Sequence, residues 1–404
     1  MEPIDLPLYK TLQTLPAFPF ANIVRQSAKS TRVARERFLL DRTPPSFAFH
    51  QLDRFDAAAY LTALKSVHDR IASLPAEEDI RSLYLEKLSE LSTRLNIVNA
   101  MKRKDDAAVS TFADHLFGAP LQTAQELSSE FDSLLARSHE LHTHQDRVNA
   151  ESFERMVRAT LDYYDLHHWN IRFTNHPSIS IAHGDDGVKI PTVKIPKKFL
   201  SSRARAARLL THEIEVHGLR TANGMTSQIL LLGRGLANYI TTDEGLAVAM
   251  QQRLKTEEST DPGFWDAWTA ALSKELDFRG CFETIFTARK KLNVALHIEN
   301  ANEEALDTAW RLCLRVSRGI HHPNVPGFGF RRDHLYRSGL LHIRKVFDVY
   351  GEKNILPTLF AGHASVNHIP FLQSRNIIGR IPDFVGTRIV KEILRSEKNR
   401  TAQQ

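Results

Sequence analysis

Cysteine is scarce in this sequence of 404 residues, and long apolar runs are missing from it. Its two cysteines, Cys281 and Cys313, are too few for a disulfide framework or a cysteine-rich zinc cluster, and such low use fits a reducing cytosol. The longest apolar run, residues 229–232, ends at Gly233 and falls far short of the ~20 residues that a membrane-spanning helix needs. We therefore expect neither a disulfide-stabilised nor a membrane-spanning protein.

The N-terminus also lacks the features of a secretory signal. Acidic residues stand where a signal would be basic, and prolines interrupt what would be a smooth apolar stretch. Together with the low cysteine content, this predicts a cytoplasmic protein.

No extreme of composition or charge is present. Hydrophobic residues make up 42% of the chain and charged residues 25%, which excludes wholesale disorder and fibrous sequence. The net charge is +6, and basic residues gather between Arg315 and Lys345, where Asp333 is the only acidic residue. That segment favours a nearby anion, but no nucleic-acid-binding motif accompanies it, so we do not expect nucleic acid as a partner.

Apolar periodicity predicts a predominantly helical α+β protein. Helical spacing runs from Asp56 to about Phe117, from Leu121 to Ala136 and from Ser152 to Asp165, whereas residues 1–50 look irregular. We therefore expect a helical N-terminal region over residues 1–150.

Alternating residues predict one small sheet after this helical region. Its expected strands are Trp169–Phe173, Ile179–Ile181, Val188–Ile190 and Val193–Ile195. Because prolines 191 and 196 flank the last strand and proline cannot donate to a sheet ladder, we expect an edge strand there. Such an edge can bind an extended peptide.

The candidate metal ligands lie in the helix that follows the sheet, which Ser201 or Ser202 can cap and Gly218 can end. His212 and His217 are five residues apart, so in a regular α-helix they would face different ways. A π-turn would return both to one face, and so would unwinding at Gly218.

A third candidate ligand, Glu244, starts the next helical run. Two histidines and one glutamate leave a fourth position open, as in hydrolytic zinc sites, so we expect one Zn²⁺ ion. Asp243 is the rival ligand. Glu213 is the candidate general base that takes a proton from the attacking water, and we expect Glu215 at the surface or behind the ligands.

The alternative for such a spacing is a pair of unrelated polar residues at a helix end. A second string of the same form, His139–His144, lies in a polar run without an apolar surround, and we interpret it as a solvated decoy.

The sequence resembles the flavohaemoglobin-expression-modulating QEGLA-motif family, whose animal relatives include microtubule-associated tyrosine carboxypeptidases. The resemblance rests on HEIEVHGLRTANG followed by DEGLA, on Arg315–Gly319 (RxxRG) and on Phe330–Gly339 (FxKDxxYxxG). These motifs span about 150–390, while the N-terminal helices match only in general character. The chain departs from the family pattern at Asp243, where the motif has glutamine, at Glu215-Val216 and at Arg332.

The resemblance implies a zincin-like metallopeptidase domain over residues 151–404, with the small sheet beside the helix that carries the histidines. His212, His217 and Glu244 correspond to the zinc ligands, and Glu213 corresponds to the catalytic glutamate. The implied reaction removes the C-terminal residue of a peptide or protein, with tyrosine or phenylalanine preferred.

A carboxypeptidase must bind a free carboxylate, and arginine is the natural partner because it forms strong bidentate bonds. We favour Arg220 and Arg318 for this role, although either can instead be an ordinary salt-bridging arginine. Asn223 can orient the substrate backbone or end a turn, and Tyr336 can stabilise the oxyanion or be a half-buried aromatic residue.

Two other functions stay open at this point. One is a zinc endopeptidase or an amide hydrolase of other specificity. The other is a non-catalytic metal-binding scaffold or regulatory protein, against which Glu213 argues, since a scaffold needs no carboxylate beside a ligand. A peptide or protein C-terminus, of which an acidic tail is one candidate, is the expected partner.

Overall fold

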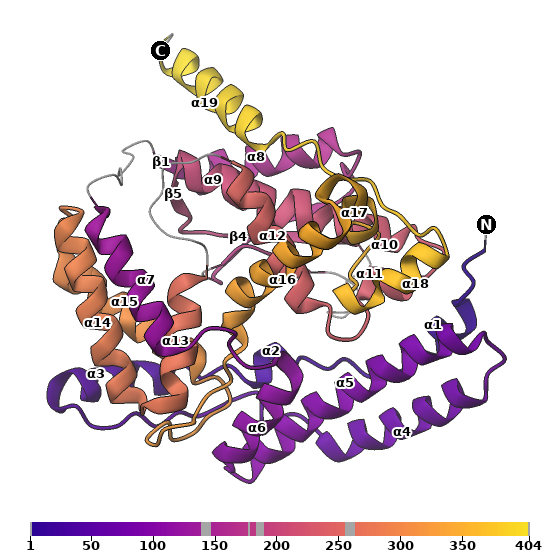
Figure 1. Ribbon diagram of the computed structural model, residues 1–404, viewed down its shortest axis with the longest axis horizontal. Coiled ribbons are helices and arrows are strands. Elements are labelled where there is room, and N and C mark those ends of the chain that lie inside the picture. The colour runs from indigo at the N-terminus through magenta and orange to yellow at the C-terminus, as the bar shows by residue number, and fades with distance from the viewer. Residues whose placement is uncertain (1, 139–146, 177, 183–189, 255–262, 403–404) are drawn as a thin grey trace. The chain divides into compact units, whose positions relative to one another are not determined.

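The structure is a computed structural model that describes residues 2–138, 147–176, 178–182, 190–254 and 263–402 (Figure 1). It is 65% helical and contains two small sheets, which confirms the predominantly helical α+β class. Among these residues, no helix is long and apolar enough to cross a membrane. The decoy at 139–144 lies outside the described residues.

The chain forms two compact units, each built from separate segments. Unit 1 contains Met1–Lys10, Thr143–Glu258 and Gly339–Gln404, and unit 2 contains Thr11–His142 and Ser259–Ser338. The predicted division into 1–150 and 151–404 therefore differs from the observed one, since residues 259–338 group with the N-terminal helices.

Unit 2 is helical, and the periodicity found in the sequence locates its longer helices well. Polar caps set their starts: Asp56 accepts from Ala58 N, and Thr123 forms a capping box with Glu126. The helices are α2 (Phe20–Ile23), α3 (Ala28–Asp41), α4 (Ala57–Ser73), α5 (Glu78–Lys102), α6 (Asp106–Phe117), α7 (Ala124–Ala136), α13 (Phe264–Glu275), α14 (Phe278–Ala295), α15 (Ala301–Val316) and the 3₁₀ turn η4 (Arg332–His334).

Helices also occupy the first 50 residues, which the sequence predicts to be irregular. Besides α2 and α3, α1 (Leu6–Leu12) begins there. Several basic residues lie on α3, whose Phe38 is fully buried and packs edge-on against Phe278 and Phe282. One buried aromatic residue thus anchors a helix whose other positions are mostly polar.

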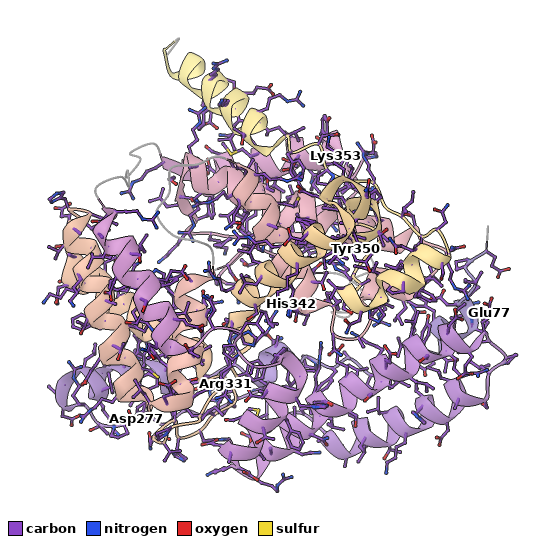
Figure 2. All side chains as sticks on the ribbon, in the orientation of Figure 1. Glu77, Asp277, Arg331, His342, Tyr350 and Lys353 are labelled. Carbon is purple, nitrogen blue, oxygen red and sulfur yellow. The ribbon has the colours of Figure 1, made fainter. Side chains whose placement is uncertain are left out.

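A buried arginine holds the loop between α15 and η4 in unit 2. Arg331, labelled in Figure 2, pairs with Asp114 of α6 at 2.7 Å and donates to the carbonyl oxygens of Gly327 and Phe328. Because its guanidinium is engaged in this way, Arg331 supports the loop itself.

Unit 1 places both small sheets and most of the remaining helices around one apolar core. Its elements are β1 (Arg147–Asn149), α8 (Ala150–Tyr163), β2 (Asn170–Thr174), β3 (Ser180–Ala182), β4 (Thr192–Pro196), β5 (Leu200–Ser202), α9 (Arg203–Leu209), the π-helix η3 (Leu210–Gly218), α10 (Leu219–Met225), α11 (Leu231–Arg234), α12 (Ile240–Arg253), α17 (Glu352–Leu359), the 3₁₀ turn η5 (Val366–His368), α18 (Ile369–Ser374) and α19 (Gly386–Ala402). The boundary at 338–339 falls inside α16 (Leu335–Tyr350).

The expected edge strand is the central strand of its sheet. β4 pairs in parallel with β2 and antiparallel with β3, so both of its sides are taken. This central position is compatible with the two prolines, because one lies just before β4 and the other is its last residue, so neither interrupts the ladder of hydrogen bonds. Among the described strands of this sheet, β2 and β3 are the edges. The predicted strand at 188–190 lies largely outside the described residues.

Candidate metal centre

The two histidines lie on a π-helix inside one continuous helical segment. Ser202 caps α9 through Arg205 N, as predicted, and α9 passes into η3 and then into α10. Gly218 has φ −61° and does not end the helix. Of the two devices that could bring His212 and His217 to one face, the structure contains the π-turn.

The π-helix has a direct geometric consequence for the imidazoles. Bonds from i to i+5 place residues five apart on the same face, and the rings of His212 and His217 lie 4.7 Å apart between centroids. β3 packs beside this helix, with Ile181 close to Gly218. The small sheet therefore lies beside the helix that carries the histidines.

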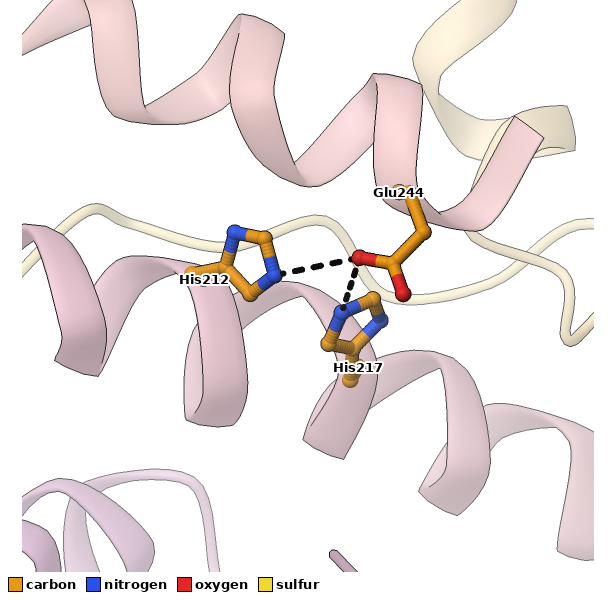
Figure 3. A group of neighbouring side chains, drawn as sticks. All are labelled: His212, His217 and Glu244. Carbon is orange, nitrogen blue, oxygen red and sulfur yellow. Dashed lines mark ion pairs between the residues drawn. The ribbon is translucent and has the colours of Figure 1, made fainter. Parts of the chain in front are cut away.

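Glu244 reaches the histidines from α12, which packs against the π-helix. Its Oε2 lies 3.3 Å from His212 Nε2 and 3.6 Å from His217 Nε2 (Figure 3). One ligand atom from each residue falls within 4.8 Å of the others. We refer to His212, His217 and Glu244 as the HHE cluster.

The HHE cluster fits a zinc ion in both donor type and spacing. Imidazole nitrogen and carboxylate oxygen are ordinary zinc ligands, and two ligands ~2.0–2.1 Å from a tetrahedral ion lie roughly 3.3–3.4 Å apart. The two distances from Glu244 Oε2 are close to that value. Three protein ligands leave one position for water or substrate, as hydrolytic sites require.

The electrostatics of the cluster favour a cation. Burial acts to raise the pKa of Glu244, but hydrogen bonds from His212 and His217 outweigh it and lower that pKa to about 2. Burial acts to lower the pKa of His217, yet the carboxylates of Asp243 and Glu244 hold it well above its usual value. Glu244 is thus ionised at neutral pH, ready to meet a positive charge.

Glu213 lies between His212 and His217 on the π-helix, directly after His212, and is part-buried. Burial raises the pKa of Glu213, opposed by the charges of His212 and His217, which shows that it lies within their field. Among the described residues, no donor is hydrogen-bonded to this carboxylate. Burial thus raises the basicity of this carboxylate, as suits a general base.

Asp243 lies beside the cluster in a way that the sequence does not reveal. Its Oδ2 is 2.8 Å from His217 Nδ1, the ring nitrogen other than the one that approaches Glu244. Its Oδ1 accepts from Arg220 at 2.6 Å and lies 3.1 Å from His363 Nδ1. Despite burial, these cationic and donor partners hold the pKa of Asp243 well below its usual range. Asp243 contacts a candidate ligand from behind, which does not fit its expected part as rival ligand.

Arg220 is engaged inside the fold, and this arrangement does not fit a substrate-binding role. Its side chain is 0% exposed, and it donates to Asp243 and to the carbonyl oxygens of Gly362 and Ala364, each of the latter at 2.8 Å. No exposed donor is left for a substrate carboxylate. The guanidinium instead links the backbone at residues 362 and 364 to Asp243, which contacts His217 of the HHE cluster.

Asn223 is also used internally. Its amide nitrogen donates to the carbonyl oxygens of Phe360 and Arg380 at 2.7 and 2.9 Å. Because both contacts are with backbone far along the chain, the side chain fixes the C-terminal part of unit 1 rather than orienting a substrate.

Arg318 and Tyr336 belong to unit 2, whereas the HHE cluster belongs to unit 1. Arg318 pairs with Asp333 at 3.2 Å and keeps 26% of its side chain exposed. Arg315 shares the same carboxylate, and its guanidinium lies 6.0 Å from the ring centroid of Tyr336. The two predicted residues are therefore neighbours of one ion-pair network within unit 2.

Glu215 is fully buried, which excludes the surface, one of the two positions expected for it. It accepts from the hydroxyls of Tyr164 and Thr211 and from Val385 N at 2.6–2.8 Å. Burial raises the pKa of Glu215, and these donors oppose the rise. The side chain thus anchors the π-helix to α8 and to the start of α19.

A family model described as microtubule-associated tyrosine carboxypeptidase matches residues 37–255, more than half of the chain. The chain belongs to this family. The matched segment includes η3 and α12, hence the whole HHE cluster. It also begins well inside the N-terminal helices, which we expected to match only in general character, and it stops before the motifs at 315–339. No curated protein gives a significant match. Membership in the family supports a peptidase of the carboxypeptidase type.

Proposed function

We propose that the protein is a zinc-dependent carboxypeptidase of zincin-like architecture that releases a C-terminal tyrosine or phenylalanine from a peptide or protein. The observation that carries the proposal is the π-helical register, which brings His212, His217 and Glu244 together beside Glu213. Family membership supports the C-terminal direction of cleavage. The two free, buried cysteines support a cytoplasmic setting.

The residues of the HHE cluster would hold Zn²⁺ through the Nε2 atoms of His212 and His217 and a carboxylate oxygen of Glu244. When bound, the ion supplies a Lewis acid that polarises the scissile carbonyl and lowers the pKa of water from ~15.7 toward ~7. The ionised Glu244 partly neutralises the ion while leaving it net positive.

Glu213 handles the proton in this proposal. Its carboxylate takes one proton from water as the water oxygen bonds to the scissile carbonyl carbon, and it delivers that proton to the leaving nitrogen as the C–N bond breaks. Burial suits Glu213 to both steps, because a raised pKa brings proton gain and proton loss closer to balance at neutral pH.

The roles predicted from the sequence for Arg318, at the terminal carboxylate of the substrate, and for Tyr336, at the developing oxyanion, stay predictions, because both residues belong to unit 2. Exposure supports Arg318 over Arg220, because 26% of its side chain is accessible whereas Arg220 has none. An acidic substrate tail would also suit the basic excess of the segment at 315–345.

The decisive experiment compares Glu213→Gln with the wild type in metal content and in cleavage of peptides ending in tyrosine or phenylalanine. We expect one zinc per chain in both proteins and a loss of cleavage of at least ~100-fold in the variant, because general acid–base catalysis is worth that much. Glu151→Gln, the same chemical change at an exposed position of α8, is the control and should leave both properties unchanged.

Amidated peptides decide between this proposal and an endopeptidase. Blocking the terminal carboxylate should abolish cleavage by a carboxypeptidase and spare cleavage by an endopeptidase. Zinc binding without cleavage of any free peptide would instead favour a non-catalytic scaffold, and Glu213→Gln with full activity would remove Glu213 from the mechanism.

A further inference from the structure

We propose that Asp243 is a positioning residue that fixes the tautomer of His217, so that the Nε2 of this ring is always the nitrogen offered to the metal. This inference rests on the proposed function, because it concerns how a metal ligand is prepared. It assigns a task to a carboxylate that lies behind the HHE cluster.

The two nitrogens of His217 have different neighbours. Nδ1 lies 2.8 Å from Asp243 Oδ2, an ion-pair contact, while Nε2 faces Glu244 at 3.6 Å. An imidazole that binds a metal ion through one nitrogen carries its remaining proton on the other, and at this distance a bare ring nitrogen would repel the carboxylate oxygen, which can only accept. The proton therefore belongs on Nδ1, and the lone pair of Nε2 is left for a metal ion. Carboxylates commonly orient metal-binding histidines in this way.

The opposite side of Asp243 is held equally firmly. Arg220 donates to Oδ1 at 2.6 Å, is 0% exposed and has no acceptor atoms of its own. His363 adds its Nδ1 at 3.1 Å from the same oxygen, and its Nε2 lies 2.9 Å from Thr221 Oγ1. Asp243 thus has a donor beside each of its two oxygens, and a carboxylate can accept on both sides at once.

Asparagine at this position would create a specific conflict. Its side chain has one accepting oxygen and one donating NH₂ group. Arg220 remains a donor, so the oxygen must face Arg220 and the NH₂ group must face His217 Nδ1. That nitrogen would then have to accept, which moves the ring proton to Nε2 and blocks the metal-binding atom. Alanine at 243 removes the carboxylate without imposing either tautomer.

The test measures Zn²⁺ affinity of the full chain by competition with a chelator, for Asp243→Asn, Asp243→Ala and the wild type. We expect both variants to bind more weakly, Asp243→Asn by about 100-fold and Asp243→Ala by nearer 10-fold, the range that outer-shell changes span. Asp162→Asn, an exposed position of α8, is the matched control and should bind as the wild type does.

The order of the two losses separates the possible roles. A pure charge effect predicts equal losses, a packing role predicts that alanine is worse, and either result would overturn the tautomer assignment. Because breaking the Asp243–Arg220 pair can prevent folding, a second measurement uses the unaltered protein. The ¹⁵N spectrum of its histidine rings, with Zn²⁺ bound, should show His217 protonated at Nδ1, and metal bound at Nδ1 would refute the proposal. A wild type that binds no Zn²⁺ would contradict the proposed function itself.

Discussion

Glu244 is the member of the HHE cluster whose single oxygen, Oε2, approaches both imidazoles. A carboxylate with a pKa of about 2 is fully ionised at neutral pH, so it contributes charge as well as geometry. Its neighbour Asp243 carries the same charge but directs it at the far side of His217. In the proposed zinc site, the two adjacent acidic residues thus have separate tasks, Glu244 toward the ion and Asp243 toward His217.

We expect Glu244→Gln to weaken Zn²⁺ binding by more than about 100-fold, because a lost ligand costs more than a lost outer-shell partner. Metal analysis after dialysis against a weak chelator is the measurement. Glu151→Gln serves again as control. Zinc retained at wild-type affinity would mean that Glu244 is not a ligand.

Sequence alone brought out the residues whose chemistry is rare, and it misjudged those whose partners lie far along the chain. His212, His217 and Glu244 stand out because the histidine pair has a third candidate ligand after it and an apolar surround, which the string at 139–144 lacks. Arg220 and Asn223 do not, because their acceptors are backbone carbonyls of residues 360–364 and 380, which no local pattern marks.

Two glycines of unit 1 show how the helices of the cluster are placed. A Cβ on Gly245, the residue after Glu244, would lie 2.2 Å from the backbone of Gly339 in α16. A Cβ on Gly218 would meet nothing closer than 3.5 Å. The close approach at Gly245 therefore fixes where α12 presents Glu244, while Gly218 is an ordinary helical position.

We expect Gly245→Ala to lower the free energy of unfolding by about 3 kcal/mol, since backbone must move to admit the new methyl group. Gly218→Ala should instead be neutral or raise it by up to about 1 kcal/mol, because alanine is the better helix former. Chemical denaturation of both variants measures this difference. A destabilised Gly218→Ala alongside a normal Gly245→Ala would contradict the packing described for α12.

Helices could be predicted where apolar residues recur at helical spacing. The pairing of the strands could not be predicted. The helices at 57–136 follow from apolar spacing. The requirement for two histidines on one face predicted either a π-turn or unwinding at Gly218, and the structure decides between them. The centre of the sheet did not follow, because prolines at the ends of β4 exclude ladder bonds only at those ends. The sequence could not decide between an exposed and a buried position for Glu215, because its hydrogen-bond donors come from α8 and from residue 385.

At the scale of the whole molecule, we expect a buried histidine of unit 2 to make the stability of that unit depend on pH. His334 of unit 2 is 1% exposed, donates from Nε2 to Gly118 O at 3.0 Å and pairs through Nδ1 with the Ser338 hydroxyl at 2.9 Å. Burial lowers the pKa of His334 to about 4. The neutral ring thus satisfies every polar atom it has.

We expect His334 to make unit 2 sensitive to mild acid. Between pH 6.5 and 4 the unfolded chain binds a proton that folded His334 does not. The free energy of unfolding therefore decreases as the pH is lowered, by about 3 kcal/mol over this range. Above pH 6.5 this contribution is fully present. His334→Gln should flatten the profile over that range, and His50→Gln, an exposed control in the same unit, should not. An unchanged slope in His334→Gln would refute the assignment.

The division into units was beyond sequence analysis, because each unit is assembled from segments that nothing local connects. The pattern of the sequence changes from helical spacing to alternation only after about residue 165, whereas the chain passes from unit 2 to unit 1 between residues 142 and 143, and no linker marks the passages near 258 and 338. Whether the helices at 259–338 belong to unit 1 or to unit 2 depends on the core against which their apolar faces pack. The spacing of their apolar residues would be the same in either unit.

The pairing of Arg220 with the carbonyl oxygens of residues 362 and 364 sets an order of events during biosynthesis. A ribosome adds residues from the N-terminus, so both histidines and Glu244 leave the exit tunnel more than a hundred residues before those acceptors do. Until then, the guanidinium lacks two of its acceptors, and Asp243 lacks His363. The HHE cluster therefore gains the support of these contacts only late in translation, and a chain that ends before residue 364 has His212, His217 and Glu244 without it.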